Sequence, residues 1–299
     1  MPDQQKEKHL NRLSRRAFLK GGTLFLAGST LLPGRSLAAG DDKPKVRIGL
    51  VTDLHYADKD PWYNRYYRDT LTKLAAAAKD FAAIKPDFVI ELGDLIDSGL
   101  SVDAEKGHLK RIAKELALLP GPHHYVLGNH CVDNLTKAEF LEIVGQKSSY
   151  YSFDINGCHF VVLDACFTSK RLPYGRKNST WTDANIPSAE IDWLKADMQR
   201  TPNKTVVFLH QRLDVEPPYG VKNAPEIRKI LSDSGKVLAV LQGHYHKGDL
   251  KEIDGIHYCT LKAMIEGRGL ENNAYAIMDV LPGDAIRITG FGNQTSYKW

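Results

Sequence analysis

The sequence of 299 residues is poor in cysteine, and its few cysteines form no recognisable motif. None of the four belongs to a C-x-x-C pair, so nothing in their spacing suggests a redox or zinc function. Disulfide bonds would be allowed if the protein left the cytoplasm, but free buried thiols are the simpler alternative. The sequence leaves the pairing open for Cys131, Cys158, Cys166 and Cys259.

Long hydrophobic runs are also missing. The apolar run near the N-terminus covers residues 21–32, which is twelve residues, whereas a helix that crosses a bilayer needs about 20. We therefore expect no stable membrane span. The run belongs instead to a leader, because a basic stretch precedes it and a small-residue segment follows it at 36–38.

The leader contains two adjacent arginines. The string S-R-R-A-F-L-K at residues 14–20 resembles the twin-arginine export signal. We expect residues 1–39 to be a signal peptide that is removed, which leaves residues 40–299 as the mature protein. The resemblance implies the twin-arginine export machinery as a partner and a periplasmic or secreted location.

A strong net charge is the third missing feature. The whole chain carries a formal charge of +4, but segment 1–38 contributes seven Lys and Arg against two Asp and Glu. The remainder has 33 basic and 34 acidic side chains, a net charge of about −1. This balance gives no reason to expect a nucleic-acid polymer or an anionic membrane as a partner.

After residue 40 the sequence alternates between β-rich and helical segments. Strand patterns at 45–53, 87–94 and 123–130 enclose helical patterns at 65–84 and 101–119, which favours a largely parallel sheet. A hairpin is predicted at 148–166, helices at 188–200 and 224–233, and strands at 205–210, at 236–244 and in the tail. No repeat or linker interrupts this pattern, so we expect one α/β domain at 40–299.

Polar side chains follow five of these strands, at the point where each strand ends. The carboxyl ends of parallel strands meet at one edge of a sheet, so we expect these groups to lie close together. Residues i and i+2 of an extended chain point to the same side, which suits pairs such as the two histidines at 244 and 246. The converging side chains are Asp53, His55, Asp94, Asn129, His130, His210, His244 and His246.

In combination these residues resemble the motifs of the calcineurin-like metallophosphoesterases. The family pattern is D-x-H, G-D-x-x-D, G-N-H, a lone H and G-H-x-H, and it stands here at 53–55, 93–97, 128–130, 210 and 243–246. The resemblance covers residues 46–247. It implies a four-layer α/β/β/α sandwich with two mixed β-sheets.

The resemblance also implies two divalent or transition metal ions, for which Mn, Fe and Zn suit the nitrogen and oxygen donors. One ion would be held by Asp53, His55, Asp94 and His246. The other would be held by Asp94, Asn129, His210 and His244, so that Asp94 bridges the two.

His130 follows a ligand in the G-N-H motif but is not itself a ligand in the family. The resemblance implies that His130 assists the leaving group and that Asp97 orients it and holds it charged. The alternative for Asp97 is a helix N-cap. Cys131 stands where the family often has an acidic residue, a departure that concerns local support only.

The segment 55–71, which follows the first motif, offers candidate substrate-binding residues. Arginine can clamp a phosphate and an aromatic ring can stack on a base, so we single out Arg65, Arg68 and Tyr67 together with Asn129. Packed tyrosines and solvated arginines are the alternative. The segment resembles the manganese-dependent ADP-ribose/CDP-alcohol diphosphatase branch, which often has Gln at the position of His55. The polar excursion at 167–187 would frame an anionic substrate or would simply be a solvated loop.

These observations predict an exported binuclear-metal phosphohydrolase. It would cleave a small phosphate ester or a nucleotide-like diphosphate by attack of a metal hydroxide on phosphorus. The alternatives are a general phosphomonoesterase or phosphodiesterase without nucleotide preference, and a non-catalytic metal-binding scaffold of the same fold. A nuclease of the family is disfavoured by the near-neutral charge.

Overall fold

The computed structural model describes residues 43–299. The predicted signal peptide, residues 1–39, lies outside the described residues and stays a prediction. Within the described part no helix is both long and apolar enough to cross a membrane.

The first sheet has six strands in the order β12-β11-β10-β1-β2-β3. Its centre is parallel: β1 (Val46–Val51) pairs with β2 (Phe88–Glu91), and β2 pairs with β3 (His123–Tyr125). On the other side of β1, the strands β10 (Ala274–Val280), β11 (Ile286–Gly292) and β12 (Tyr297–Lys298) pair antiparallel. The late part of the chain therefore completes a sheet that its first strands begin.

The second sheet has six strands in the order β4-β5-β6-β7-β9-β8. Its parallel centre consists of β5 (Cys158–Val162), β6 (Lys204–Phe208), β7 (Val237–Gln242) and β9 (Ile256–Lys262). Antiparallel strands close both edges, β4 (Tyr151–Ile155) against β5 and β8 (Lys247–Ile253) against β9. The predicted hairpin at 148–166 is thus confirmed as β4 and β5.

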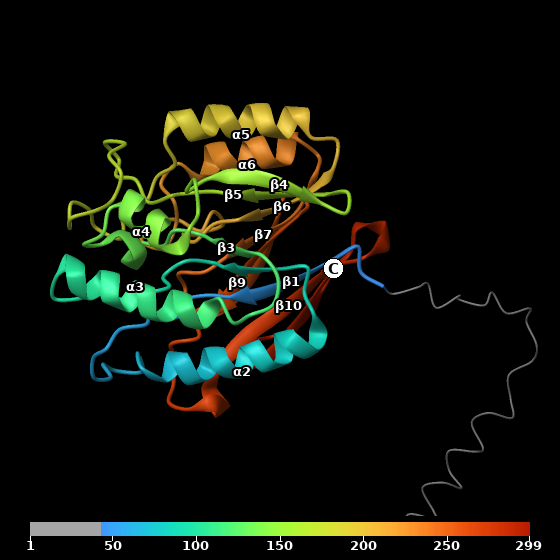
Figure 1. The fold of residues 1–299 in the computed structure, drawn as a ribbon. Helices are drawn as coiled ribbons and strands as arrows, with labels where there is room; N and C mark the ends of the chain where they lie inside the picture. Colours follow the sequence, from blue (N-terminus) through green and yellow to red (C-terminus); the bar gives the residue numbers. More distant parts are fainter. Residues whose placement is uncertain (1–42) are drawn as a thin grey trace, which may run out of the picture. The chain divides into compact units, whose positions relative to one another are not determined.

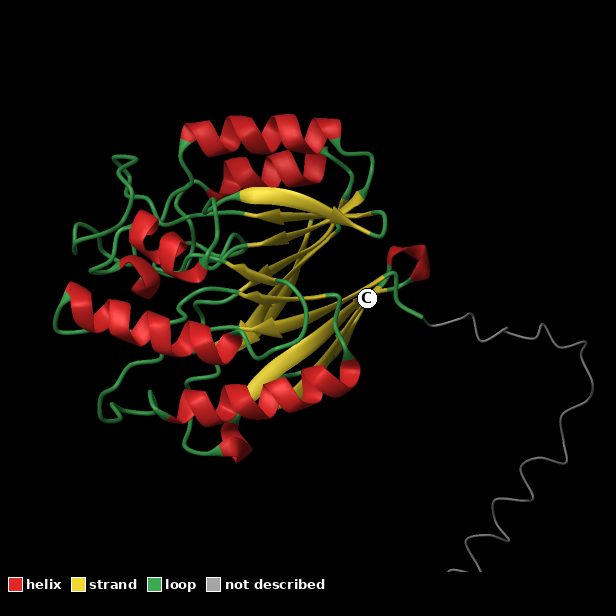
Figure 2. Ribbon diagram, viewed as in Figure 1, coloured by secondary structure: helices red, strands yellow, loops and turns green. Residues whose placement is uncertain are grey.

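Helices cover the outer face of each sheet, which gives four layers (Figures 1 and 2). The helices α2 (Asp69–Ile84), α3 (Val102–Leu116) and α4 (Lys137–Val144) pack on the first sheet through one apolar cluster. The helices α5 (Ser188–Arg200) and α6 (Ala224–Asp233) pack on the second sheet through another. The predicted α/β/β/α sandwich with two mixed sheets is confirmed.

A third apolar cluster fills the space between the two sheets. Phe88 of β2 lies at its centre, with ring centroids 5.1 Å from Phe160 and 5.3 Å from Phe153 in edge-to-face contacts. Aromatic pairs of this kind add about 0.5–1.5 kcal/mol each to the free energy gained by burial. This layer fixes how the two sheets lie against each other, and so fixes the relative position of side chains at their ends.

Two expectations from the sequence need correction, and one helix was not expected. The largely parallel sheet is instead two mixed sheets, because the tail strands return antiparallel beside β1. The helix predicted at 65–84 begins at Asp69, because Trp62 and Arg65 exchange backbone hydrogen bonds of 3.1 and 3.0 Å in a tight turn. The helix α4 was not predicted, although Thr136 and Glu139 form a capping box at its start.

Candidate metal centre

The predicted ligands follow five strands that belong to both sheets. Three of these strands, β1, β2 and β3, lie in the first sheet, whereas β6 and β7 lie in the second. The expectation of one edge of one parallel sheet is therefore wrong. The two sheets are stacked face to face, and the carboxyl ends of their parallel strands meet at one end of the sandwich. The structure brings together Asp53, His55, Asp94, Asn129, His210, His244 and His246.

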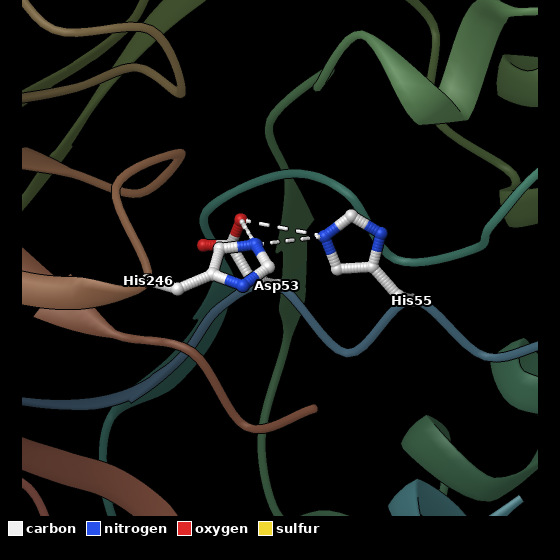
Figure 3. Close-up of side chains that lie close together, drawn as sticks. All are labelled: Asp53, His55 and His246. Atoms are coloured by element: carbon white, nitrogen blue, oxygen red, sulfur yellow. Dashed lines mark hydrogen bonds and ion pairs between the residues drawn. The ribbon is translucent and has the colours of Figure 1, made fainter. Parts of the chain in front are cut away.

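The first group consists of Asp53, His55 and His246, whose side chains point toward one another in Figure 3. The Nε2 atoms of the two histidines are 3.2 Å apart. The Oδ1 atom of Asp53 lies 3.4 Å from Nε2 of His246 and 3.7 Å from Nε2 of His55. Two imidazole nitrogens and a carboxylate oxygen thus converge on one point.

The second group consists of Asp94, His210 and His244. Nε2 of His210 lies 3.1 Å from Oδ2 of Asp94 and 3.2 Å from Nδ1 of His244. The same Oδ2 atom of Asp94 lies 3.6 Å from Nε2 of His55 in the first group. Asp94 therefore contacts both groups through one oxygen, as a bridging ligand requires.

The backbone at four of these residues is strained. Positive φ values of 50° at Asp53, 45° at His55, 58° at Asp94 and 69° at His244 place all four in the left-handed region. Such a conformation costs about 1–3 kcal/mol per residue outside glycine and persists where the surroundings enforce it. Here the N–H groups of Asp53 and His55 donate to the carbonyls of Gly93 and Asp94 at 3.0 and 2.8 Å.

Two glycines let the chain segments approach closely enough to form the centre. A Cβ atom at Gly128 would overlap the Asp94 carboxylate, and one at Gly243 would overlap Asp53 and Thr52. These glycines are the first residues of the G-N-H and G-H-x-H motifs. Their role is close approach rather than side-chain chemistry.

The donors that remain without partners fit metal ions. The Oδ1 atom of Asn129 and the Nε2 atom of His244 are buried and have no hydrogen-bond partner among the described residues. A buried polar atom without a partner costs about 1–3 kcal/mol, so an amide oxygen in this position is suited to a ligand. The full donor set is nitrogen and oxygen, which suits Mn, Fe and Zn.

Burial controls the protonation of the candidate histidine ligands. It lowers the pKa of His244 to about 3 and that of His55 to about 4, so both are neutral at neutral pH. Burial also acts to lower the pKa of His246, but hydrogen bonds with Asp53 and Glu266 outweigh it and raise that pKa to about 9. A cation that binds His246 must therefore displace a proton.

His130 and Asp97 lie beside the first group. Nδ1 of His130 is 2.9 Å from Oδ1 of Asp97, and the His130 ring makes an edge-to-face contact with His55 at 4.6 Å. Burial lowers the pKa of His130, but the Asp94 charge and the Asp97 hydrogen bond outweigh it and raise the pKa. The alternative helix N-cap for Asp97 is not observed, because Ser101 caps α3.

Only some of the candidate substrate residues line a cavity near the metal ligands. Arg65 lines a cavity of about 220 Å³ over the metal ligands and also an adjoining one of about 400 Å³, which Tyr67 lines too. Asn129 lines the first cavity. Arg68 lines neither, because its guanidinium bonds to Asp58 and Asp60 on the surface.

Several residues around the centre have no motif that would reveal them. Oε1 of Glu266 lies 2.6 Å from Nδ1 of His246, and the carbonyl of Leu92 accepts from Nδ1 of His210 at 2.9 Å. Such partners orient metal-binding imidazoles. The rings of Trp181 and Tyr219 lie 5.5 and 5.7 Å from the His244 ring at the rim. Trp181 belongs to the predicted 167–187 excursion, whereas Tyr219 had no signal.

The sequence profile of the calcineurin-like phosphoesterase family matches residues 46–248, more than half of the chain, and spans every candidate ligand. The chain belongs to the calcineurin-like phosphoesterase family. It is a metal-dependent hydrolase of phosphoester bonds.

This phosphoesterase has relatives named manganese-dependent ADP-ribose/CDP-alcohol diphosphatase. The Xenopus tropicalis protein is 27% identical, and the alignment covers 75% of this chain and 86% of the relative. The Arabidopsis thaliana protein is 25% identical, with 75% and 88% covered. A Fibrobacter succinogenes protein named probable cyclic nucleotide phosphodiesterase is 24% identical, with 69% and 74% covered.

Solved structures share the fold of the phosphoesterase. A dimetal phosphatase from Danio rerio has a TM-score of 0.75 at 21% identity, and the match covers 86% of this chain and 99% of that one. A purple acid phosphatase from yellow lupin has a TM-score of 0.57 at 12% identity, with 85% and 54% covered. At these identities the likeness concerns the fold alone.

Replacing Asp94 by Asn should remove most of the bound metal. One oxygen of Asp94 contacts a histidine ring nitrogen in each group, so the variant should fall from about two ions per chain to one or fewer. Metal analysis after manganese loading and gel filtration measures this. Asp60→Asn, at a side chain 93% exposed, is the matched control and should keep the wild-type content. Equal metal content in the two variants would contradict the bridging role.

Proposed function

We propose that the protein hydrolyses a small phosphorylated, nucleotide-like substrate with two divalent metal ions bound at the end of the sandwich. The observation that carries the proposal is the pair of donor groups joined by Oδ2 of Asp94. The Asn129 oxygen, which has no hydrogen-bond partner within residues 43–299, and the cavity above the groups support it. A non-catalytic scaffold would have no use for His130 beside this cavity.

The residues would divide between the two ions as the family resemblance implies. One site would use the first group with Asp94, and the other would use the second group with Asn129. When bound, two such ions polarise a phosphate and make an attacking water more acidic. The chain supplies their spacing, because the Asp94 oxygen holds the two groups together.

His130 is placed to deliver a proton to the leaving oxygen. It lines both cavities, so a phosphate over the metal ligands would have its leaving group directed along His130 toward the second cavity. The Asp97 carboxylate fixes the ring through Nδ1, which leaves Nε2 to face the substrate. Arg65, whose Nη1 lies 3.8 Å from Oδ2 of Asp97, is positioned to bind a further phosphate oxygen.

The diphosphatase relatives support a nucleotide-like substrate. Two adjoining cavities suit a molecule with two parts joined by a diphosphate, and the exposed rings of Trp62, Trp181 and Tyr219 offer faces for stacking. A general phosphatase is the second candidate. It is favoured by His55, which completes an ordinary ligand set where the diphosphatase branch often has Gln.

A rate panel on the manganese-loaded enzyme tests the substrate class. We expect higher kcat/KM for ADP-ribose and CDP-choline than for p-nitrophenyl phosphate or bis(p-nitrophenyl) phosphate. Arg65→Ala should lower kcat/KM on the diphosphates by about 10–100-fold, since a charged hydrogen bond contributes about 1.5–3 kcal/mol. Arg68→Ala is the matched control and should change it by less than about fivefold. Preference for the monoester would identify a general phosphatase instead.

His130→Asn should lower kcat by about 10²–10⁴-fold on a substrate with a poor leaving group and leave the metal content unchanged. The loss should be much smaller on a p-nitrophenyl ester, because nitrophenolate leaves without a proton. An equal loss on both substrates would show that His130 is not the proton donor.

We also propose that the enzyme is exported, from the twin-arginine pattern in residues 14–20. Replacing Arg15 and Arg16 together by Lys should retain the precursor in the cytoplasm, as measured by fractionation of the producing bacterium. Arg12→Lys, in the same leader but outside the pair, should export normally. Normal export of the double variant would remove this part of the proposal.

A further inference from the structure

The segment 263–267, which follows β9, connects three parts of the candidate metal centre. Its backbone N–H groups at Met264 and Ile265 donate to the carbonyls of Thr52 and Asp53, each at 3.1 Å. The N–H of Ala263 donates to the carbonyl of His246 at 3.1 Å. The segment therefore lies beside the first and the last ligand of the first donor group.

The same segment also holds the loop that lines the second cavity. The carbonyl of Ile265 accepts from the N–H of Tyr66 at 3.2 Å, and the N–H of Gly267 donates to the carbonyl of Asn64 at 2.9 Å. Glu266 adds a side-chain link, because Oε1 lies 2.6 Å from Nδ1 of His246 while Oε2 accepts from Nδ2 of Asn64 at 2.7 Å.

Lys73 of α2 reaches this segment from beneath. Its side chain is fully buried, and Nζ donates to the carbonyls of Met264, Glu266 and Gly267 at 2.8, 2.8 and 2.7 Å. An ammonium group has three N–H donors, so these three bonds use all of them. Within residues 43–299 Lys73 makes no salt bridge, so its hydrogen bonds go to carbonyls, while the charges of Asp69, Glu266 and Glu271 act on it from a longer distance.

A buried cation without a carboxylate in direct contact is costly, and burial lowers the pKa of Lys73 to about 8 although three carboxylates farther away act against it. A methionine would fill the same volume without that cost. Three carbonyl dipoles that point at one spot repel one another. The ammonium group offsets this repulsion and so stabilises the turn. Without the ammonium group, the turn would open and carry Glu266 away from His246.

We propose that Lys73 is a positioning residue for the metal site formed by Asp53, His55 and His246. It fixes the 263–267 turn, and through Glu266 it fixes the orientation of the His246 ring. Among the described residues no hydrogen bond joins this turn directly to Asp94, His210 or His244, so we expect the effect to fall mainly on one of the two ions. This inference rests on the two-metal function proposed above.

The test compares Lys73→Met with Lys79→Met, an exposed lysine on the same helix. Manganese is titrated into metal-free protein, and the free ion is followed by its EPR signal. Lys73→Met should bind one ion about 10–100-fold more weakly than wild type and the other unchanged, the loss typical of a lost partner behind a metal ligand. Lys79→Met should match wild type. Glu266→Gln should weaken the same ion, and combining it with Lys73→Met should add little.

A second readout uses the metal-free protein. Amide hydrogen exchange in 264–267 should be faster in Lys73→Met than in wild type, while the exchange of α5 and α6 stays the same. Should Lys73→Met fail to fold, Lys73→Gln replaces it, since its amide can donate to part of the turn.

Two outcomes would overturn the positioning role: an unchanged manganese isotherm, or equal weakening of both ions. Wild-type protein that binds fewer than two ions would refute the two-metal function. In that case hydrogen exchange in 264–267 still decides the role of Lys73, and unchanged exchange would refute it.

Discussion

One buried carboxylate oxygen, Oδ2 of Asp94, joins the two halves of this molecule. It lies 3.6 Å from a histidine at the end of β1 and 3.1 Å from a histidine at the end of β6, strands that belong to different sheets. The site therefore exists only if the sheets are stacked in one relative position. The aromatic layer around Phe88 between the sheets supplies that constraint, although none of its residues is a candidate metal ligand.

The centre accumulates features that oppose folding. Four left-handed residues that are not glycine, a buried amide oxygen without a partner and converging imidazoles each cost free energy in the metal-free chain. A rigid frame compensates: parallel strands hold the ends, and the glycines at 128 and 243 leave room for the carboxylates. Bound cations would remove much of the remaining cost. The same donors that destabilise the metal-free protein would therefore favour metal binding.

The sequence alone predicts the fold and most of the candidate donors. Residues at strand ends, such as Asp53 and His210, carry short motifs, and the order of those motifs predicts the fold, which is confirmed, and a candidate ligand set, whose members lie together in the structure. What the sequence did not show depends on contacts across the sandwich. Glu266 lies twenty residues after His246 with no motif of its own, and only the contacts of Arg68 with Asp58 and Asp60 distinguish it from Arg65. The direction of the tail strands likewise depends on the sheet edge with which they pair. The local sequence pattern of those strands does not reveal that edge.

The contributions to the centre are spread over nearly the whole chain. Its first donor is residue 53, its last is residue 246, and the carboxylate behind that last donor is residue 266. Even the neighbour of β1 in the sheet, β10, begins at residue 274. An N-terminal fragment that ends before residue 246 lacks at least one of these candidate donors, so a complete centre could form only after residue 246 has been synthesised. The order of residues along the chain would thus delay assembly of the complete centre until late in synthesis.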